Sequence, residues 1–147
     1  MTSNAPSRSR AVTLAFATGE CGAENWAAIA RDAFKKGTVA ALDAASIKYV
    51  ISTGGAAGKF TCSSAAKLLD FVNYYKTPSM VGVDFDIEGS QSQTEITNLV
   101  AGAKAAAAAF PAMRFSFTLA TLGGYSNTSN LNSLGDSVMK AIASAGL

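Results

Sequence analysis

Four apolar, β-rich runs recur along the chain at nearly equal spacing, and this repetition limits the possible folds more than any other feature. Successive runs begin 36, 33 and 33 residues apart, which is the length of a strand, a helix and the return to a parallel strand. The runs occupy residues 11–17, 47–53, 80–86 and 113–120, and helical patterns follow them at 25–36, 63–75, 93–110 and 131–145. We therefore predict an α/β fold of four parallel βα units, with helices covering a sheet of largely hydrophobic strands.

Chain length and charge narrow the alternatives further. The 147 residues suit one domain with a real core, but fall well short of the roughly 250 residues of a closed eight-stranded α/β barrel. We expect a flexible N-terminal segment at residues 1–10 and a single domain at 11–147. Charged residues make up 15% of the chain and the net charge is +2, which argues against a nucleic-acid partner.

The same composition gives no sign of a membrane partner. No apolar stretch approaches the roughly 20 residues of a membrane span, and residues 1–10 lack the apolar core of a signal peptide. The chain is therefore expected to be cytosolic or to lack its leader. Histidine is absent, so any acid-base chemistry falls to carboxylates.

Three carboxylates occupy alternate positions around the end of the third run: Asp84, Asp86 and Glu88. Because a strand sends every second side chain to the same face, these groups should line up at steps of roughly 6.6 Å. Desolvation and mutual repulsion should raise the proton affinity of at least one of them. Such a row is costly in a central strand unless its members are paired, bound to a ligand or used in chemistry. These residues are the main candidates for a functional site.

Small and polar residues mark the ends of neighbouring runs. The second run ends with Ser52, followed by Gly54 and Gly55, and the fourth run contains Ser116 and Thr118. Paired glycines after a strand are also typical of a simple tight turn. In parallel βα units, however, the carboxyl ends of all strands share one face, where functional loops gather. We expect these residues to lie near the three acids.

Together, the two motifs resemble those of a known enzyme family. A Ser-x-Gly-Gly strand end followed one βα unit later by Asp-x-Asp-x-Glu closely resembles the chitinases of glycoside hydrolase family 18, and the likeness extends over nearly the whole chain. The matching positions are Ser52, Gly54, Gly55, Asp84, Asp86 and Glu88. The resemblance implies a partial TIM-type (β/α)8 barrel, with these four strands corresponding to the second through fifth strands of the full barrel.

The resemblance also implies a mechanism. In the family, the glutamate that ends the motif is the general acid, so Glu88 would protonate the glycosidic oxygen while the N-acetyl carbonyl of the substrate attacks the anomeric carbon. This substrate-assisted chemistry uses neither an enzyme nucleophile nor a cofactor. Asp86 would stabilise the resulting oxazolinium ion, Asp84 would share a proton with Asp86, and Ser52 would support them. The implied partners are chitin or chito-oligosaccharides, and the implied location is extracellular.

Two aromatic residues and two missing elements qualify this interpretation. Trp26 and Tyr125 belong to loops at the same end and could stack on sugar rings, or could equally be packing aromatics. The chain lacks the family's Met-x-Tyr element, whose tyrosine holds the N-acetyl group, and its late tryptophan beneath the sugar. A fragment, a sugar-binding protein without turnover, or an oligomer formed through exposed sheet edges therefore stays open.

Two further alternatives concern a metal and a disulfide. The acid row could instead hold a divalent cation, for which Mg²⁺ or Ca²⁺ would suit the oxygen ligands better than Zn²⁺. Cys21 and Cys62 follow the first and second runs, so adjacent loops could bring their sulfurs together. A disulfide would close a loop of about 42 residues and contribute roughly 3 to 4 kcal/mol, as in a secreted enzyme. The alternative is two ordinary thiols.

Overall fold

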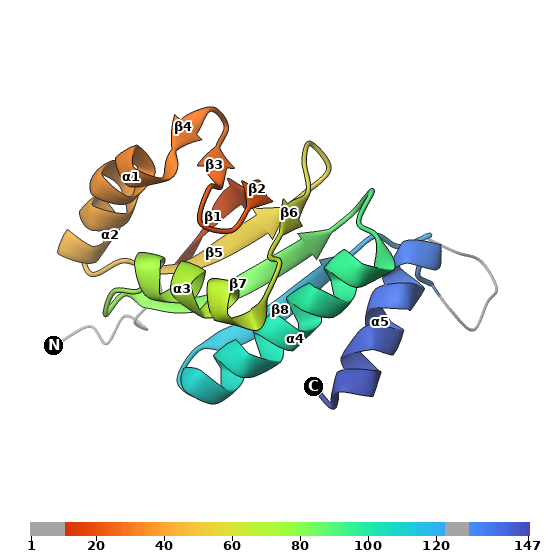
Figure 1. Cartoon of the computed structure of the whole chain (residues 1–147). Coiled ribbons are helices and arrows are strands. Elements are labelled where there is room, and N and C mark those ends of the chain that lie inside the picture. The colour runs from red at the N-terminus through yellow and green to blue at the C-terminus, as the bar shows by residue number, and fades with distance from the viewer. Residues whose placement is uncertain (1–10, 123–129) are drawn as a thin grey trace, which may run out of the picture.

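The main sheet of the computed structural model has four parallel strands whose spatial order follows their order in the chain (Figure 1). The structure describes residues 11–122 and 130–147. The strands are β1 (Ala11–Ala17), β5 (Lys48–Gly54), β7 (Met80–Ile87) and β8 (Arg114–Leu119). This confirms the predicted α/β fold of parallel βα units, and each strand limit lies within one residue of its predicted position. The N-terminal segment at 1–10 lies outside the described residues.

Three long helices lie along one face of the sheet (Figure 1). They are α3 (Ala65–Tyr75), α4 (Gln93–Ala109) and α5 (Ser133–Ala145). Polar side chains cap the starts of α3 and α4. At α3, the side chain of Ser64 accepts a hydrogen bond from the backbone N–H of Lys67. At α4, Ser92 and Glu95 form a reciprocal capping box. Among the described residues, no helix is long and apolar enough to cross a bilayer.

The predicted helix at 25–36 is wrong at its start. A hairpin occupies that position, with β3 (Asn25–Trp26) antiparallel to β4 (Ile29–Ala30). The helical stretch begins only afterwards, as α1 (Arg31–Phe34), a π-helical turn η1 (Lys35–Val39) and α2 (Ala40–Ala44). The alanines around Trp26 favour a helix, but tertiary contacts of the indole ring outweigh this local preference.

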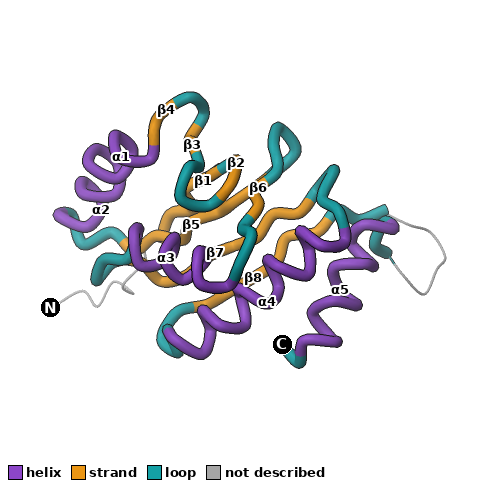
Figure 2. Tube along the Cα trace, in the orientation of Figure 1, coloured by secondary structure: helices purple, strands orange, loops and turns teal. Residues whose placement is uncertain are grey.

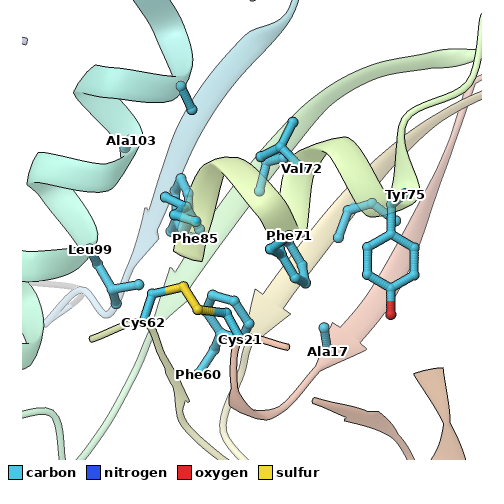
Figure 3. Packing of buried hydrophobic residues seen from close by; sticks show 14 of the residues in the cluster. Ala17, Cys21, Phe60, Cys62, Phe71, Val72, Tyr75, Phe85, Leu99 and Ala103 are labelled. Atoms are coloured by element: carbon cyan, nitrogen blue, oxygen red, sulfur yellow. A yellow bond between two sulfur atoms is a disulfide. The ribbon is translucent and has the colours of Figure 1, made fainter. Parts of the chain in front are cut away.

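The core lies between the sheet and its helices (Figure 3). Phe85 of β7 is fully buried, as is Val72 of α3, while Phe71 and Leu99 are 1% exposed. The short strand β2 (Gly19–Glu20) pairs with β6 (Phe60–Thr61), and this contact brings together the segments that carry the two cysteines.

Of the two states considered for the cysteines, the structure has the disulfide. Cys21 and Cys62 are joined, with their Cα atoms 5.1 Å apart, and both side chains are buried. The bond ties the loop after β1 to the loop after β5, and both loops lie at the carboxyl end of the sheet (Figure 2). The wall of loops above the strand ends is thus covalently anchored.

Candidate active site

Two rows of residues cross the sheet at its carboxyl end. In the first row, Ser52 of β5 pairs with Asp84 of β7, which pairs with Ser116 of β8. In the second row, Asp86 lies between Gly54 and Thr118. Residues in register on neighbouring strands present their side chains to the same face, and positions two apart on one strand do so as well. The two rows therefore form one polar patch on the face opposite the helices.

Asp84 is held by hydroxyl groups from both neighbouring strands. Its Oδ2 accepts from Ser52 Oγ at 3.0 Å and its Oδ1 accepts from Ser116 Oγ at 2.7 Å. Thr118 Oγ1 lies 3.1 Å from each of the two carboxylate oxygens. These partners fix the orientation of the carboxylate and satisfy both oxygens. Ser52 lies where sequence reasoning expected it, while Ser116 and Thr118 were expected near the acids without a stated partner.

Asp86 is buried but has an incomplete set of partners. Its side chain is 6% exposed, and its Oδ1 has no hydrogen-bond partner among the described residues. Burial raises the pKa of Asp86 to about 6, and the charge of Glu88, a side-chain hydrogen bond with Glu88 and the charge of Asp84 add to the rise. The site can therefore hold a proton near neutral pH.

Glu88 follows the last residue of β7 and is exposed. Asp86 and Asp84 lie successively farther from the carboxyl end of β7, with Asp86 buried and Asp84 half-buried. The row therefore contains one solvent-accessible acid, one buried acid with a raised pKa and one half-buried carboxyl group whose two oxygens both accept hydrogen bonds. Such an arrangement can deliver a proton to a ligand at its open end.

The two glycines allow the second strand to approach the acids closely. Gly54 has φ +87°, and a Cβ there would lie 2.2 Å from the carbonyl oxygen of Asp86. Gly55 has φ +82°, and its N–H donates to that same oxygen at 3.0 Å. Both glycines thus have the unusual backbone angles that the simpler interpretation expected, with Gly54 ending β5 and a turn following at residues 56 and 57, and this strand end borders the site.

Phe16 is a residue of this region that sequence reasoning did not single out. Its ring is 39% exposed and lies over Gly55, where a Cβ would be 3.0 Å from the ring. Leu14 pairs with Ile51 and Ala17 with Thr53, so β1 carries one extra residue between these pairs. This shift turns Phe16 toward the face of Gly54. A strict alternation read from the sequence would place Phe16 with Leu14 on the helix-covered face.

The two aromatic residues proposed for sugar stacking have different outcomes. Trp26 is 3% exposed, its ring stacks on Phe34 at 3.8 Å between centroids, and its Nε1 donates to Tyr75 Oη at 2.9 Å. Of the two roles considered for Trp26, the structure shows packing. Tyr125 lies outside the described residues.

The metal alternative gains no support from side-chain placement. Within residues 11–122 and 130–147, no group of three or more Asp, Glu, Cys or His side chains is arranged to hold an ion. Asp84 and Asp86 lie on one strand face, but hydroxyl donors already occupy both oxygens of Asp84.

Comparison with known proteins gives structural matches. No protein-family model matches the chain, and no curated protein matches it. The structure is similar to the catalytic domain of a hyperthermophilic chitinase from Pyrococcus furiosus, with a TM-score of 0.69, 24% sequence identity and 94% of this chain covered. Catalytic-site mutants of active domain 2 of the chitinase from this organism are similar as well, one of them complexed with chito-oligosaccharides, with a TM-score of 0.68 and 24% identity over 93% of this chain.

These matches show the fold. The chain has a chitinase-like fold, and its parallel sheet with alternating helices corresponds to part of an α/β barrel. It spans 45% of the length of each of these three structures. In barrels of this type, the active site lies at the carboxyl ends of the strands, which is where the three acids lie here.

Proposed function

We propose that the chain carries the catalytic strand of a chitinase-like glycoside hydrolase of family 18 that cleaves β-1,4-linked N-acetylglucosamine polymers. One observation carries this proposal: Asp84, Asp86 and Glu88 follow one another along a strand end that opens at the active-site end of a chitinase-like fold. The rise in the pKa of Asp86 to about 6 adds to it, because a proton that Asp86 retains near neutral pH lies beside Glu88, the group that must donate one in acid catalysis.

The proposed reaction follows substrate-assisted, retaining chemistry. Glu88 donates its proton to the glycosidic oxygen, and the bond between that oxygen and the anomeric carbon breaks. The acetamido carbonyl oxygen of the same sugar forms a bond to the anomeric carbon, which gives a cyclic oxazolinium ion. Glu88, now a carboxylate, takes a proton from water, whose oxygen attacks the anomeric carbon and reopens the ring. Both displacements invert the carbon, so the configuration is retained overall.

Asp86 and Asp84 have supporting roles in this scheme. The unpartnered Oδ1 of Asp86 can accept a hydrogen bond from the N–H of the acetamido group. This contact would orient the carbonyl for attack and stabilise the positive charge that develops on the ring. Asp84, held by Ser52, Ser116 and Thr118, is a carboxyl group of fixed orientation two residues before Asp86 on the same face of β7.

The experiment that tests this function is Glu88→Gln, which keeps the shape of the side chain but removes the proton. We expect release of the chromophore from a chromogenic chitobioside to fall by about 10²- to 10⁴-fold, the usual contribution of a general acid. Affinity for N-acetylchitotetraose, measured by calorimetry, should stay within about twofold, since a uniform binding contact is not removed. Loss of both properties, or of neither, contradicts the assignment of Glu88.

Calorimetry on the unmodified chain also separates turnover from binding alone. A chain that binds N-acetylchitotetraose but releases no product would be a sugar-binding protein that retains the acids. We further propose that the protein works outside the cell. The Cys21–Cys62 disulfide supports this location, because such bonds persist in oxidising compartments.

A further inference from the structure

A small cavity lies beside the acid row, at the carboxyl ends of β1 and β5. It measures about 310 Å³ and is lined by Ala15, Phe16, Thr18, Ala27, Gly54 and Ala57. Gly54 is in register with Asp86, so the cavity borders the strand end that carries the acids. Its volume is at the lower end of the range for small-molecule sites. Methyl groups and one aromatic ring dominate the lining, which suits the apolar face of a sugar ring.

One wall of this cavity comes from the β3–β4 hairpin. Ala27 and Ala28 form its two-residue turn, and both have left-handed backbone angles, with φ +49° and +71°. Glycine, asparagine and aspartate are the residues that such a turn favours. Two alanines are therefore an unfavourable choice for the backbone alone. Strain of this kind persists only where surrounding structure enforces it, and it clusters at ligand sites.

A buried chain of hydrogen bonds holds the base of the hairpin. Trp26 donates to Tyr75 Oη at 2.9 Å, and Tyr75 donates to Glu24 Oε1 at 2.8 Å. Glu24 also accepts from the backbone N–H of Gly22 at 2.6 Å. The disulfide at Cys21 anchors the same loop. The position of Ala27 is thus fixed from below by contacts that do not themselves reach the cavity.

We propose that the β3–β4 hairpin is a rigid wall of the sugar-binding cleft, with Ala27 as a specificity-determining residue and Trp26 as a positioning residue. The cavity between Ala27 and Phe16 accepts one N-acetylglucosamine ring of the bound chain, next to the ring that reacts at Glu88. The methyl group of Ala27 sets how much space that ring has. This inference rests on the proposed function for its substrate class.

The test compares Ala27→Asn with Ala28→Asn. Asparagine favours the left-handed conformation at both positions, so both variants relieve the turn, but only residue 27 lines the cavity. We expect Ala27→Asn to raise the dissociation constant for N-acetylchitotetraose by about tenfold, the scale of one misfitting group in a pocket. Ala28→Asn should stay within about twofold of the unmodified protein.

Each outcome of this comparison bears on the proposal. If Ala27→Asn and the unmodified protein bind N-acetylchitotetraose with equal affinity, the hairpin is not a wall of the cleft, while the proposed function stands. Equal weakening by both asparagine variants assigns the effect to the turn backbone and also overturns the proposed wall. If the unmodified protein binds no N-acetylchitotetraose, the proposed function and this inference both fail.

The positioning role of Trp26 has its own test. Trp26→Phe keeps an aromatic ring in the core but removes the hydrogen bond to Tyr75. We expect a several-fold higher KM for oligosaccharide with kcat unchanged, because the wall shifts while the acids do not. The control is Tyr49→Phe, which removes a buried hydroxyl that donates to the carbonyl of Tyr75 at 2.7 Å and lies away from the cavity. If both variants lower stability and neither changes KM, Trp26 serves stability alone.

Discussion

Two buried carboxylates in this molecule have opposite surroundings. The side chain of Glu24 has no exposed surface, and it accepts from Gly22 and Tyr75 and pairs with Arg31 at 3.4 Å. Asp86 is 6% exposed, yet one of its oxygens has no partner in the described part of the chain. A buried carboxylate with a full set of partners is a structural element, whereas one with a free acceptor beside other acids is available for chemistry. Burial alone therefore does not identify the functional acid.

The largest expected effect concerns the disulfide that anchors the Glu24 loop. The double variant Cys21→Ser, Cys62→Ser opens a loop with a sequence separation of 41 residues. The unfolded chain gains freedom, and we expect the free energy of unfolding to fall by about 3 to 4 kcal/mol. Urea denaturation measures this loss, and reduction of the unmodified protein should reproduce it. A loss below about 1 kcal/mol would mean that the loop is held mainly by its hydrogen bonds.

Asp86→Asn tests whether the carboxyl group with the free acceptor is destabilising in its ionised form. The pKa of Asp86 rises from an ordinary 3.8 to about 6 on folding, so the folded state binds its proton more tightly than the unfolded state. The unmodified protein therefore loses stability as the pH rises between about 4 and 6, and asparagine removes this loss. We expect the variant to be on the order of 2 to 3 kcal/mol more stable than the unmodified protein at pH 8.

The control for this variant is its behaviour in acid. At pH 3.5, Asp86 is protonated in the folded state and mostly protonated in the unfolded state, so the difference in unfolding free energy between the two proteins should fall below about 0.5 kcal/mol. Taking the difference removes contributions from Glu20 and Glu95, whose hydrogen-bonded carboxylates have lowered pKa values and act in the opposite direction. A difference that is constant from pH 3.5 to 8 would contradict the raised pKa of Asp86.

Glu24→Gln tests whether the fully paired carboxylate stabilises the fold. Gly22 and Tyr75 donate to different oxygens of Glu24, and glutamine replaces one of these oxygens by an NH2 group that accepts no hydrogen bond. One buried donor therefore loses its partner. We expect a loss of about 2 kcal/mol in unfolding free energy. In contrast to Asp86→Asn, the variant should be less stable at neutral pH. If Glu24→Gln were more stable than the unmodified protein, burial of Glu24 would be destabilising, as expected for Asp86, and the two carboxylates would not differ.

The smallest effect is expected at the edge of the acid row. Ser116→Ala removes the 2.7 Å hydrogen bond to Asp84, but Ser52 and Thr118 continue to donate to the same carboxylate. We expect a loss of about 1 kcal/mol, the usual net value of one hydrogen bond. Thermal unfolding measures it, with Ser137→Ala as the serine control, because the half-buried Ser137 hydroxyl donates to the carbonyl of Ser133 within α5, away from the acids. A loss above about 3 kcal/mol would show that Ser116 alone holds the orientation of Asp84.

Regular spacing and alternation made much of this molecule predictable from its sequence. The four strands follow from their repeat, and the shared face of Asp84 and Asp86 follows from the period of two in a strand. Trp26 and Phe16 were not predictable in the same way. The hairpin at Trp26 depends on Tyr75, which lies 49 residues away in sequence, and the direction of Phe16 depends on one extra residue in β1. Local patterns carry no record of either cause.

The stacking of Trp26 on Phe34 has a practical consequence for spectroscopy. Trp26 is the only tryptophan of the chain, and its ring is shielded from water between Phe34 and Tyr75. Indole emission moves to longer wavelength when water reaches the ring. The wavelength of maximum tryptophan emission therefore reports whether the β3–β4 hairpin has separated from α3. It can be recorded without any attached label.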